Sequence, residues 1–448
     1  MNVRRIAKLM LIVLLVLCAP GLTFPLTLGE SVKIALQENH EIKAMEEKKK
    51  GAKYGVMESV GNFLPTVSVA TNYSRAEGGR KFEFPIATRA DLTTGEILYE
   101  ASVETGFLEE EAHDTKLEIV QPIFQGGALW SQLGLSRAQN RAADHELLAK
   151  QQEIALRVQK AYYGVLEAEK MLQAMEQAVE LAQEHYRVAE ALQQAGMTGR
   201  AETLRADVLL SSTLQDRLAA ENGLAVSRRV FNSLLNLDLN KTIPLAEADP
   251  PASMELTMEE CVQKALGHNP GLSGFQEQLR AAAKSKGLAR SAFLPKLNLI
   301  FDYGWHEEAY EFDPEADFWM VMGVASWDLF TSGRNLAVYQ QSKAGYRQVE
   351  HELRAFRIGL ELQVTQAYLS FEEARNRLDL ARRSLTSAEE NYRVTEASYR
   401  EGMAAQVDEI DAQVTLTEAR VTYAKTQYGL YTSQARLKNL MGIMPEFN

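Results

Sequence analysis

Residues with reactive side chains are scattered along this 448-residue chain. Its seven histidines lack the spacing of a metal site, and pairs such as His145–Glu146 and His351–Glu352 fit solvated helix faces. The sequence contains no glycine-rich phosphate loop, no zinc-protease motif and no nucleophile elbow. We therefore expect no enzymatic activity and no cofactor.

The N-terminal segment indicates export, and the two cysteines do not indicate a disulfide. A basic start followed by an apolar run at 9–17 predicts a signal peptide over residues 1–21. Two readings of Cys18 stay open: it accepts a lipid, or it leaves with the leader. In the second case Cys261 is the only remaining thiol, and no internal disulfide can form.

The charge of the chain excludes one class of partner. The net charge is −12, and the leader carries +3, so the exported chain carries about −15. Nucleic-acid binding needs a basic surface, so we expect no nucleic-acid partner. This net negative charge is compatible with a solvated surface or with channel walls that disfavour anions.

The sequence is duplicated. Residues from Leu26 to Tyr73 recur 230 positions later, and residues from Phe124 onward recur 206 positions later. We define repeat 1 as residues 26–236, a linker as 237–254 and repeat 2 as 256–442. The two offsets differ by 24, so repeat 1 carries 24 extra residues between Tyr73 and Phe124, expected to form a long acidic outer loop that includes Glu109, Glu110 and Glu111.

Each repeat begins with helices. Thr27 with Glu30, and Thr257 with Glu260, have the spacing of a capping box ahead of a short helix. A second helix follows and ends at a Phe-Leu-Pro motif, because proline stops a helix and suits the first residue of a strand.

Strands are predicted after each Phe-Leu-Pro motif, at about 65–75 and 115–124 in repeat 1 and at about 295–306 and 318–330 in repeat 2. Their residues alternate between apolar and polar, and aromatics lie near their ends. Strands of about ten residues with this pattern suit a transmembrane barrel. A half-buried soluble sheet would also alternate. Export, the aromatic ends and the duplication favour the membrane.

Long helical hairpins complete the repeats, at 128–236 and 334–442. Each first arm runs without proline for a length of roughly 100 Å at about 1.5 Å per residue. Apolar residues recur at 3-4 spacing in matching register, which is typical of a coiled coil. The arms break at Gly196 and Gly402, which we interpret as hairpin tips.

Four strands per chain imply an oligomer. An open sheet in lipid would leave backbone groups unpaired, so the strands must close into a barrel with other copies. Two chains would supply eight strands, and three would supply twelve, which leave room for a lumen. The predicted fold is mostly α with a membrane β part, in which a sheet barrel continues into a helical barrel.

These motifs resemble the TolC-type outer-membrane efflux protein family over nearly the whole chain from Leu26 to Gly442. The resemblance rests on the Leu-Thr helix starts, the Phe-Leu-Pro junctions, the Phe-x-Gly-Gly and Phe-x-x-Gly junctions, and the two glycine tips, each followed six residues on by an acid. It implies a homotrimer with a 12-stranded β-barrel and a 12-helix α-barrel, in the outer membrane of a Gram-negative bacterium with a large periplasmic part. One departure is Asp328, where the family often has the proline found here as Pro122.

The family resemblance also implies partners and site residues. The chain would contact outer-membrane lipid and would act as the passive exit duct of a tripartite efflux or type I secretion system. A periplasmic adaptor protein would dock on the tips and link the chain to an inner-membrane pump of RND, ABC or MFS type. The implied docking residues are Gly196, Met197, Thr198, Glu202, Gly402, Met403, Ala404 and Asp408. The candidate gate acids are Glu389, Glu390 and Glu396.

Two other classes of protein stay open. A periplasmic coiled-coil adaptor would also be exported, acidic and helical, but it has no reason for duplicated aromatic strand pairs. A secreted coiled-coil structural protein would leave the strands unexplained. The sequence does not identify the cargo.

Overall fold

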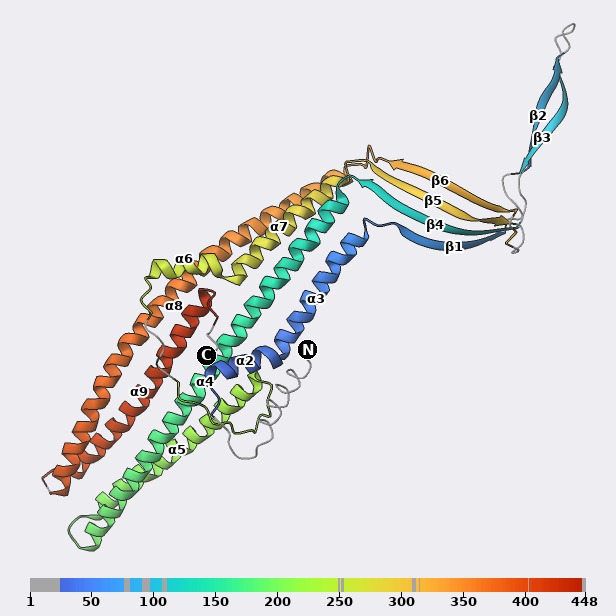
Figure 1. Ribbon diagram of the computed structural model, residues 1–448. Helices are drawn as coiled ribbons and strands as arrows, with labels where there is room; N and C mark the ends of the chain where they lie inside the picture. The colour runs from blue at the N-terminus through green and yellow to red at the C-terminus, as the bar shows by residue number, and fades with distance from the viewer. Residues whose placement is uncertain are drawn as a thin grey trace, which may run out of the picture. The chain divides into compact units, whose positions relative to one another are not determined.

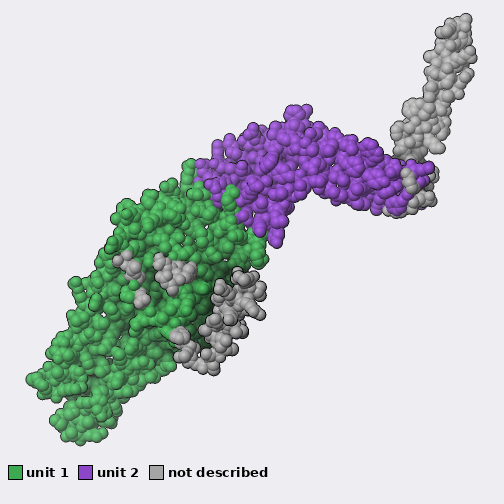
Figure 2. Space-filling view, in the orientation of Figure 1, with its two compact units in different colours: residues 1–50, 141–276, 351–448 green, residues 51–140, 277–350 purple. Residues whose placement is uncertain are grey.

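The computed structural model describes residues 25–75, 81–90, 97–106, 111–248, 250, 254–307, 312–313, 315–401 and 403–444. The predicted signal peptide with Cys18, two of the insert's acids (Glu109 and Glu110) and the tip residue Gly402 lie outside these residues. The chain divides into two compact units, coloured separately in Figure 2. Unit 1 comprises residues 1–50, 141–276 and 351–448, and unit 2 comprises 51–140 and 277–350.

Unit 2 contains one four-stranded antiparallel sheet (Figure 1). Its strands are β1 (Thr66–Arg75), β4 (Glu111–Gln125), β5 (Lys296–Glu307) and β6 (Asp317–Ser326), in the order β1-β4-β5-β6. The central pair, β4 and β5, joins the two repeats. Alternation in the sequence therefore placed all four strands in the chain.

Strand β6 is shorter than predicted. It ends at Ser326, which pairs with Lys296, the first residue of β5 after Pro295. No residue of β5 remains to pair beyond this point, so the predicted continuation to residue 330 is wrong. Trp327 lies past the strand, where its indole Nε1 donates to the carbonyl oxygen of Phe293 at 3.1 Å.

The insert of repeat 1 is a β-hairpin rather than a loop. Strands β2 (Lys81–Ala90) and β3 (Ile97–Gly106) pair antiparallel with each other in a separate two-stranded sheet. The sequence carries the signal, because Phe82, Phe84 and Ile86 alternate with other residues in the manner of a strand. Length and charge alone had suggested an acidic loop.

The register of the four-stranded sheet gives it two chemically different faces. Ala70 pairs with Lys116, Lys116 with Gly304, and Gly304 with Phe318, so even-numbered residues share one face. The even-numbered residues of β1, β4 and β5 are mostly polar, whereas those of β6 are Phe318, Met320, Met322, Val324 and Ser326. We call the even-numbered face the polar face and the odd-numbered face the apolar face; in β4 this parity holds up to the bulge between Pro122 and Phe124. The apolar face includes Val67, Val69, Leu117, Ile119, Leu299, Phe301, Tyr303, Trp319 and Val321.

The capping boxes in unit 1 are confirmed. They open α2 (Leu28–Glu38) and α6 (Met258–His268). Thr27 N donates to Glu30 Oε2 at 2.9 Å, and Glu30 N donates to Thr27 Oγ1 at 3.3 Å. The helices that follow are α3 (His40–Gly61) and α7 (Pro270–Ser291).

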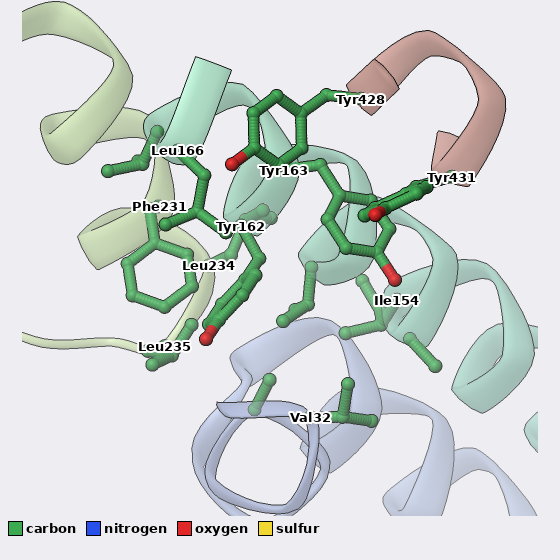
Figure 3. Close-up of a cluster of buried hydrophobic side chains, with 14 of the residues drawn as sticks. Val32, Ile154, Tyr162, Tyr163, Leu166, Phe231, Leu234, Leu235, Tyr428 and Tyr431 are labelled. Carbon is green, nitrogen blue, oxygen red and sulfur yellow. The ribbon is translucent and has the colours of Figure 1, made fainter. Parts of the chain in front are cut away.

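Four long helices form two hairpins, α4 (Ala128–Gln194) with α5 (Arg200–Leu234) and α8 (Arg334–Arg400) with α9 (Gln406–Leu440). The larger buried cluster of unit 1 joins α2, α4, α5 and α9 around Tyr162, whose hydroxyl donates to the carbonyl oxygen of Ala246 at 2.6 Å (Figure 3). A second cluster joins α6, α7, α8 and α9 around Cys261. Each repeat thus packs its short helix against its own hairpin.

Equivalent contacts recur in the two repeats at the base of the hairpins. Asn39 Nδ2 donates to the carbonyl oxygen of Leu234 at 3.1 Å, and Asn269 Nδ2 donates to that of Leu440 at 3.1 Å. Each asparagine also ends its short helix. The duplication is therefore one of side-chain contacts as well as of sequence. Among the described residues, no helix has an apolar stretch long enough to cross a bilayer.

Candidate functional site at the hairpin tips

The tip of the first hairpin is built around Gly196. Met197 N donates to the carbonyl oxygen of Leu192 at 2.9 Å, and Gly196 N donates to that of Gln193 at 2.9 Å. This pattern ends a helix through one left-handed residue, and Gly196 has φ +72°. A side chain with a Cβ would be strained here. The glycine therefore fixes where α4 turns into α5.

The second tip lies between α8 and α9, and its predicted glycine, Gly402, is outside the described residues. The chain after it turns back, with Met403 N donating to the carbonyl oxygen of Ser398 at 2.8 Å. Asp408 Oδ2 accepts a hydrogen bond from Ala405 N at 3.3 Å, which helps to cap α9. Ala404 is half-buried.

The remaining predicted docking residues lie on or beside the two turns. Met197 and Met403 expose 73% and 72% of their surface, although an apolar side chain is more stable when it is covered. Glu202 lies in the first turn of α5. Thr198 is half-buried, and its Oγ1 has no hydrogen-bond partner.

A buried polar cluster joins the two hairpins near the tips. We call His185 of α4 with Gln406 and Glu409 of α9 the tip cluster. His185 Nδ1 lies 3.1 Å from Glu409 Oε2, and His185 Nε2 lies 3.0 Å from Gln406 Nε2. The amide nitrogen can only donate, so His185 Nε2 accepts this hydrogen bond. Glu409 Oε2 lies within ion-pair distance of Nδ1 but accepts no hydrogen bond, and Gln406 Oε1 has no hydrogen-bond partner either. All three residues are buried.

A cavity of about 770 Å³ adjoins the tip cluster. Its lining includes Tyr392, Tyr399 and Glu396 as well as His185 and Glu409. Burial raises the pKa of Tyr392 to about 12, with the nearby Glu396 and Glu409 carboxylates adding to the shift. Burial also raises the pKa of Tyr399, and Glu409 and Glu202 act in the same direction. Both tyrosines therefore stay neutral hydrogen-bonding groups at physiological pH.

The three candidate gate acids occupy different environments. Glu396 lines the cavity and pairs with Arg400, whose Nη2 lies 2.6 Å from Glu396 Oε1. Glu390 is exposed and pairs with Arg393, which lowers the pKa of its carboxyl through a hydrogen bond. Glu389 is exposed. The structure therefore brings Glu396 to the tip cluster but leaves Glu389 and Glu390 outside the cavity.

The 3-4 spacing of apolar residues along 406–440 predicts a buried apolar stripe on α9, and this prediction does not reveal the tip cluster. That stripe included Val407 and Val414, which expose 50% and 40% of their surface. The buried face carries Gln406, Glu409 and Gln413 instead, and Gln413 Nε2 donates to the carbonyl oxygen of Ala178 on α4 at 3.2 Å. Their 3-4 spacing was the available signal.

The tip cluster can hold α9 against α4 or release it. Its bonds run between side chains of two separate hairpins, and water could replace each of them if the hairpins moved apart. A buried polar network is weaker when some of its atoms lack a partner, as Gln406 Oε1 and Glu409 Oε2 do here. The arrangement is suited to two positions of the hairpin tips rather than to bond-making chemistry.

Comparison with known proteins gives a consistent result. A sequence model of the outer membrane efflux protein family matches residues 32–236 and 261–443. The outer membrane protein TolC of Vibrio cholerae is 23% identical over 290 residues, which are 59% of this chain and 64% of TolC. The match thus spans less than two thirds of that relative.

Solved structures show the same fold. The outer-membrane channel OprN superposes with a TM-score of 0.77 at 19% identity, covering 93% of this chain and 89% of OprN. The outer membrane channel CmeC of Campylobacter jejuni superposes with a TM-score of 0.76 at 20% identity, covering 93% of this chain and 85% of CmeC.

Proposed function

This chain belongs to the outer membrane efflux protein family, and from that membership we propose that it is the exit duct through which an efflux or secretion system passes its cargo out of the cell. Membership places the chain in the outer membrane. It also removes the alternative of a periplasmic adaptor, because the matched family consists of the channels. The observation that carries the proposal is the four-stranded sheet with one apolar face, contributed equally by two repeats.

The edges of that sheet support closure with other copies. Strands β1 and β6 stand at the two ends of the strand order, so each has one edge without a partner among the described strands. Open edges are not stable within a bilayer. Pairing β6 of one copy with β1 of the next satisfies both. Three copies give a 12-stranded barrel with a lumen, and the family likeness favours three over two.

The internal duplication supports the same closure in the helical part. Helix α4 contacts α9, with the rings of Tyr163 and Tyr431 5.5 Å apart, while α5 and α8 flank this pair on its outer sides. The two repeats are offset by 206 positions here, so Leu369 on α8 is equivalent to Tyr163, and Ala225 on α5 is equivalent to Tyr431. Leu369 exposes 57% of its surface. We infer that it packs against α5 of the next copy, as Tyr163 packs against α9, which would close twelve helices into a tunnel.

The tips are suited to docking of a periplasmic adaptor. The exposed Met197 and Met403 occupy equivalent positions in the two hairpins, as do the exposed Val208 and Val414. An adaptor can therefore bind both hairpin tips of one chain through similar apolar contacts. Through this adaptor the duct would connect to an inner-membrane pump, which would supply the energy.

Opening would follow from movement of the tips. We infer that the tip cluster stabilises the closed state and that an outward movement of α9 away from α4 breaks its bonds. An adaptor favours the open state only if it binds that state more tightly. Docking at the residues around Gly196 and Asp408 would provide this difference, because these residues lie at the end of α4 and at the start of α9, the two helices that separate.

Cross-linking tests the closed trimer directly. A variant with Leu369→Cys and Ala225→Cys, in a background with Cys261→Ala, should give covalent trimers with a short bismaleimide. Leu380→Cys with Ala225→Cys is the matched control, because Leu380 is also exposed but lies 11 residues away, roughly 16 Å along the helix. Native mass of the untreated protein should equal three chains. A monomer without cross-links would exclude the duct.

A further inference from the structure

Three charged side chains meet on the polar face of the membrane sheet. Glu118 of β4 lies directly opposite Asp302 of β5. Lys116 Nζ lies 2.7 Å from Glu118 Oε2 and 3.4 Å from Asp302 Oδ2. We call these three residues the wall cluster. One ammonium group thus serves two carboxylates, and the wall cluster keeps a net charge of −1.

Asp302 is the unusual member of the wall cluster. Its side chain exposes 6% of its surface, compared with 33% for Lys116 and 32% for Glu118. Its Oδ1 atom is buried and accepts no hydrogen bond. A buried carboxylate oxygen without a donor is costly, and like charges directly opposite each other on neighbouring strands add to the cost. Lys116 pairs with Oδ2 and leaves Oδ1 without a donor, so the wall cluster is one positive charge short of neutral, which favours a ligand that carries positive charge.

The surroundings leave the wall cluster its negative charge. Gly304 lies opposite Lys116, and a Cβ there would come within 2.3 Å of the Thr115 carbonyl oxygen, so β4 and β5 approach closely beneath the lysine. The next cation on the polar face of β5 is Lys296. It lies six residues from Asp302, roughly 20 Å along the strand and well beyond the screening length at physiological salt.

The chemical difference between the two faces of the sheet determines whether this charge faces the lipid or the lumen. The apolar face suits lipid, so in a closed barrel the polar face lines the lumen. Ionisable groups within a membrane usually face a water-filled path and mark where ions pass. Three copies would set three wall clusters around the lumen at one level, and a ring of acidic charge favours cations.

We propose that the wall cluster is a cation-selecting site on the inner wall of the duct, where its net charge of −1 attracts the passing cation. The proposal rests on the proposed function, because it needs a lumen. The site lies in the barrel and is separate from the candidate gate acids near the tips. It would favour monovalent cations over anions, and Lys116 would set how strongly.

Reversal potentials in a KCl gradient across planar bilayers test the site. The permeability ratio of K⁺ to Cl⁻ should fall about twofold in Asp302→Asn and rise about twofold in Lys116→Gln, since the two changes shift the ring charge in opposite directions. Asp317→Asn is the matched control. Asp317 carries the same charge on the same sheet, but its odd number places it on the apolar face.

The outcomes separate this inference from the proposed function. Opposite shifts in the two variants, with no shift in the control, support the wall cluster. An unchanged ratio in both variants of a conducting trimer overturns the wall cluster and leaves the duct intact. A wild-type protein without conductance overturns the duct and the wall cluster together. If Asp302→Asn does not assemble, Lys116→Gln decides alone, because an unchanged ratio in that variant contradicts the site.

Discussion

Replacing His185 by leucine should open the duct without dissociating the trimer. The change removes the Nε2 acceptor for Gln406, which lies at 3.0 Å, and the ring whose Nδ1 lies 3.1 Å from Glu409 Oε2. Glu409 then stays buried in the closed state without its partner. When α9 moves away from α4, the carboxylate regains water. The substitution therefore destabilises the closed state relative to the open one.

The magnitude follows from the one hydrogen bond that is lost. The hydrogen bond between Gln406 and His185 contributes about 1 kcal/mol, so the closed state loses about 1 kcal/mol per chain from this bond. Because about 1.4 kcal/mol corresponds to a tenfold change, the ratio of open to closed tips should rise about fivefold per chain. Partial hydration of the cluster in the closed state would reduce this value.

Single-channel recording in planar bilayers measures the open probability. The matched control is His351→Leu, because His351 is an exposed histidine on α8, the helix of repeat 2 that is equivalent to α4. The control should behave as wild type, and both variants should keep the native mass of the wild-type oligomer. An open probability in His185→Leu equal to that of the control would show that the tip cluster does not hold the closed state.

Three further predictions concern the tip, a helix cap and the insert. Gly196→Val forces a β-branched residue to φ +72°, at a cost of about 1–3 kcal/mol, so a cell-based efflux assay should show loss of export although native gels still show the trimer; surviving export would contradict the role of the tip. Thr27→Ala should lower the stability of the chain by about 1 kcal/mol in thermal melts at neutral pH. The Thr27 hydrogen bonds lower the pKa of Glu30 from its ordinary 4.5. Their contribution to stability is therefore present above that value and is lost as pH falls through the lowered folded-state pKa. The stability difference between variant and wild type should shrink in acid, and a constant difference would assign the loss to another cause. Replacing residues 76–110 by an Asn-Gly turn should leave assembly intact, because Arg75 and Glu111 are paired opposite each other and β2 pairs with β3 alone among the described strands; loss of the trimer on a native gel would contradict this.

The elements that repeat were the ones that the sequence could predict. Thr27 and Glu30 act through a local spacing that recurs at Thr257 and Glu260, so both capping boxes were visible without tertiary information. The alternation of Val67 and Val69 with polar residues likewise placed them on one face of a strand. Local patterns of this kind carry their own structural meaning.

Features that depend on pairing between distant segments could not be read in the same way. The end of β6 at Ser326 is set by where β5 begins, 30 residues earlier. The tip cluster needs α4 and α9 side by side, which a pattern on α9 alone does not reveal. Glutamine and glutamate at helical spacing usually indicate a solvated face, and here they are buried beside a histidine that lies 221 and 224 positions away in the sequence.

The most direct test of the exit duct is single-channel conductance of the purified protein, recorded together with its native mass. We expect a trimer with small, flickering and cation-preferring conductance, because closed tips would admit ions only during brief openings. A monomer or a soluble oligomer that gives no conductance would contradict the barrel and, with it, the assignment of this chain as a channel.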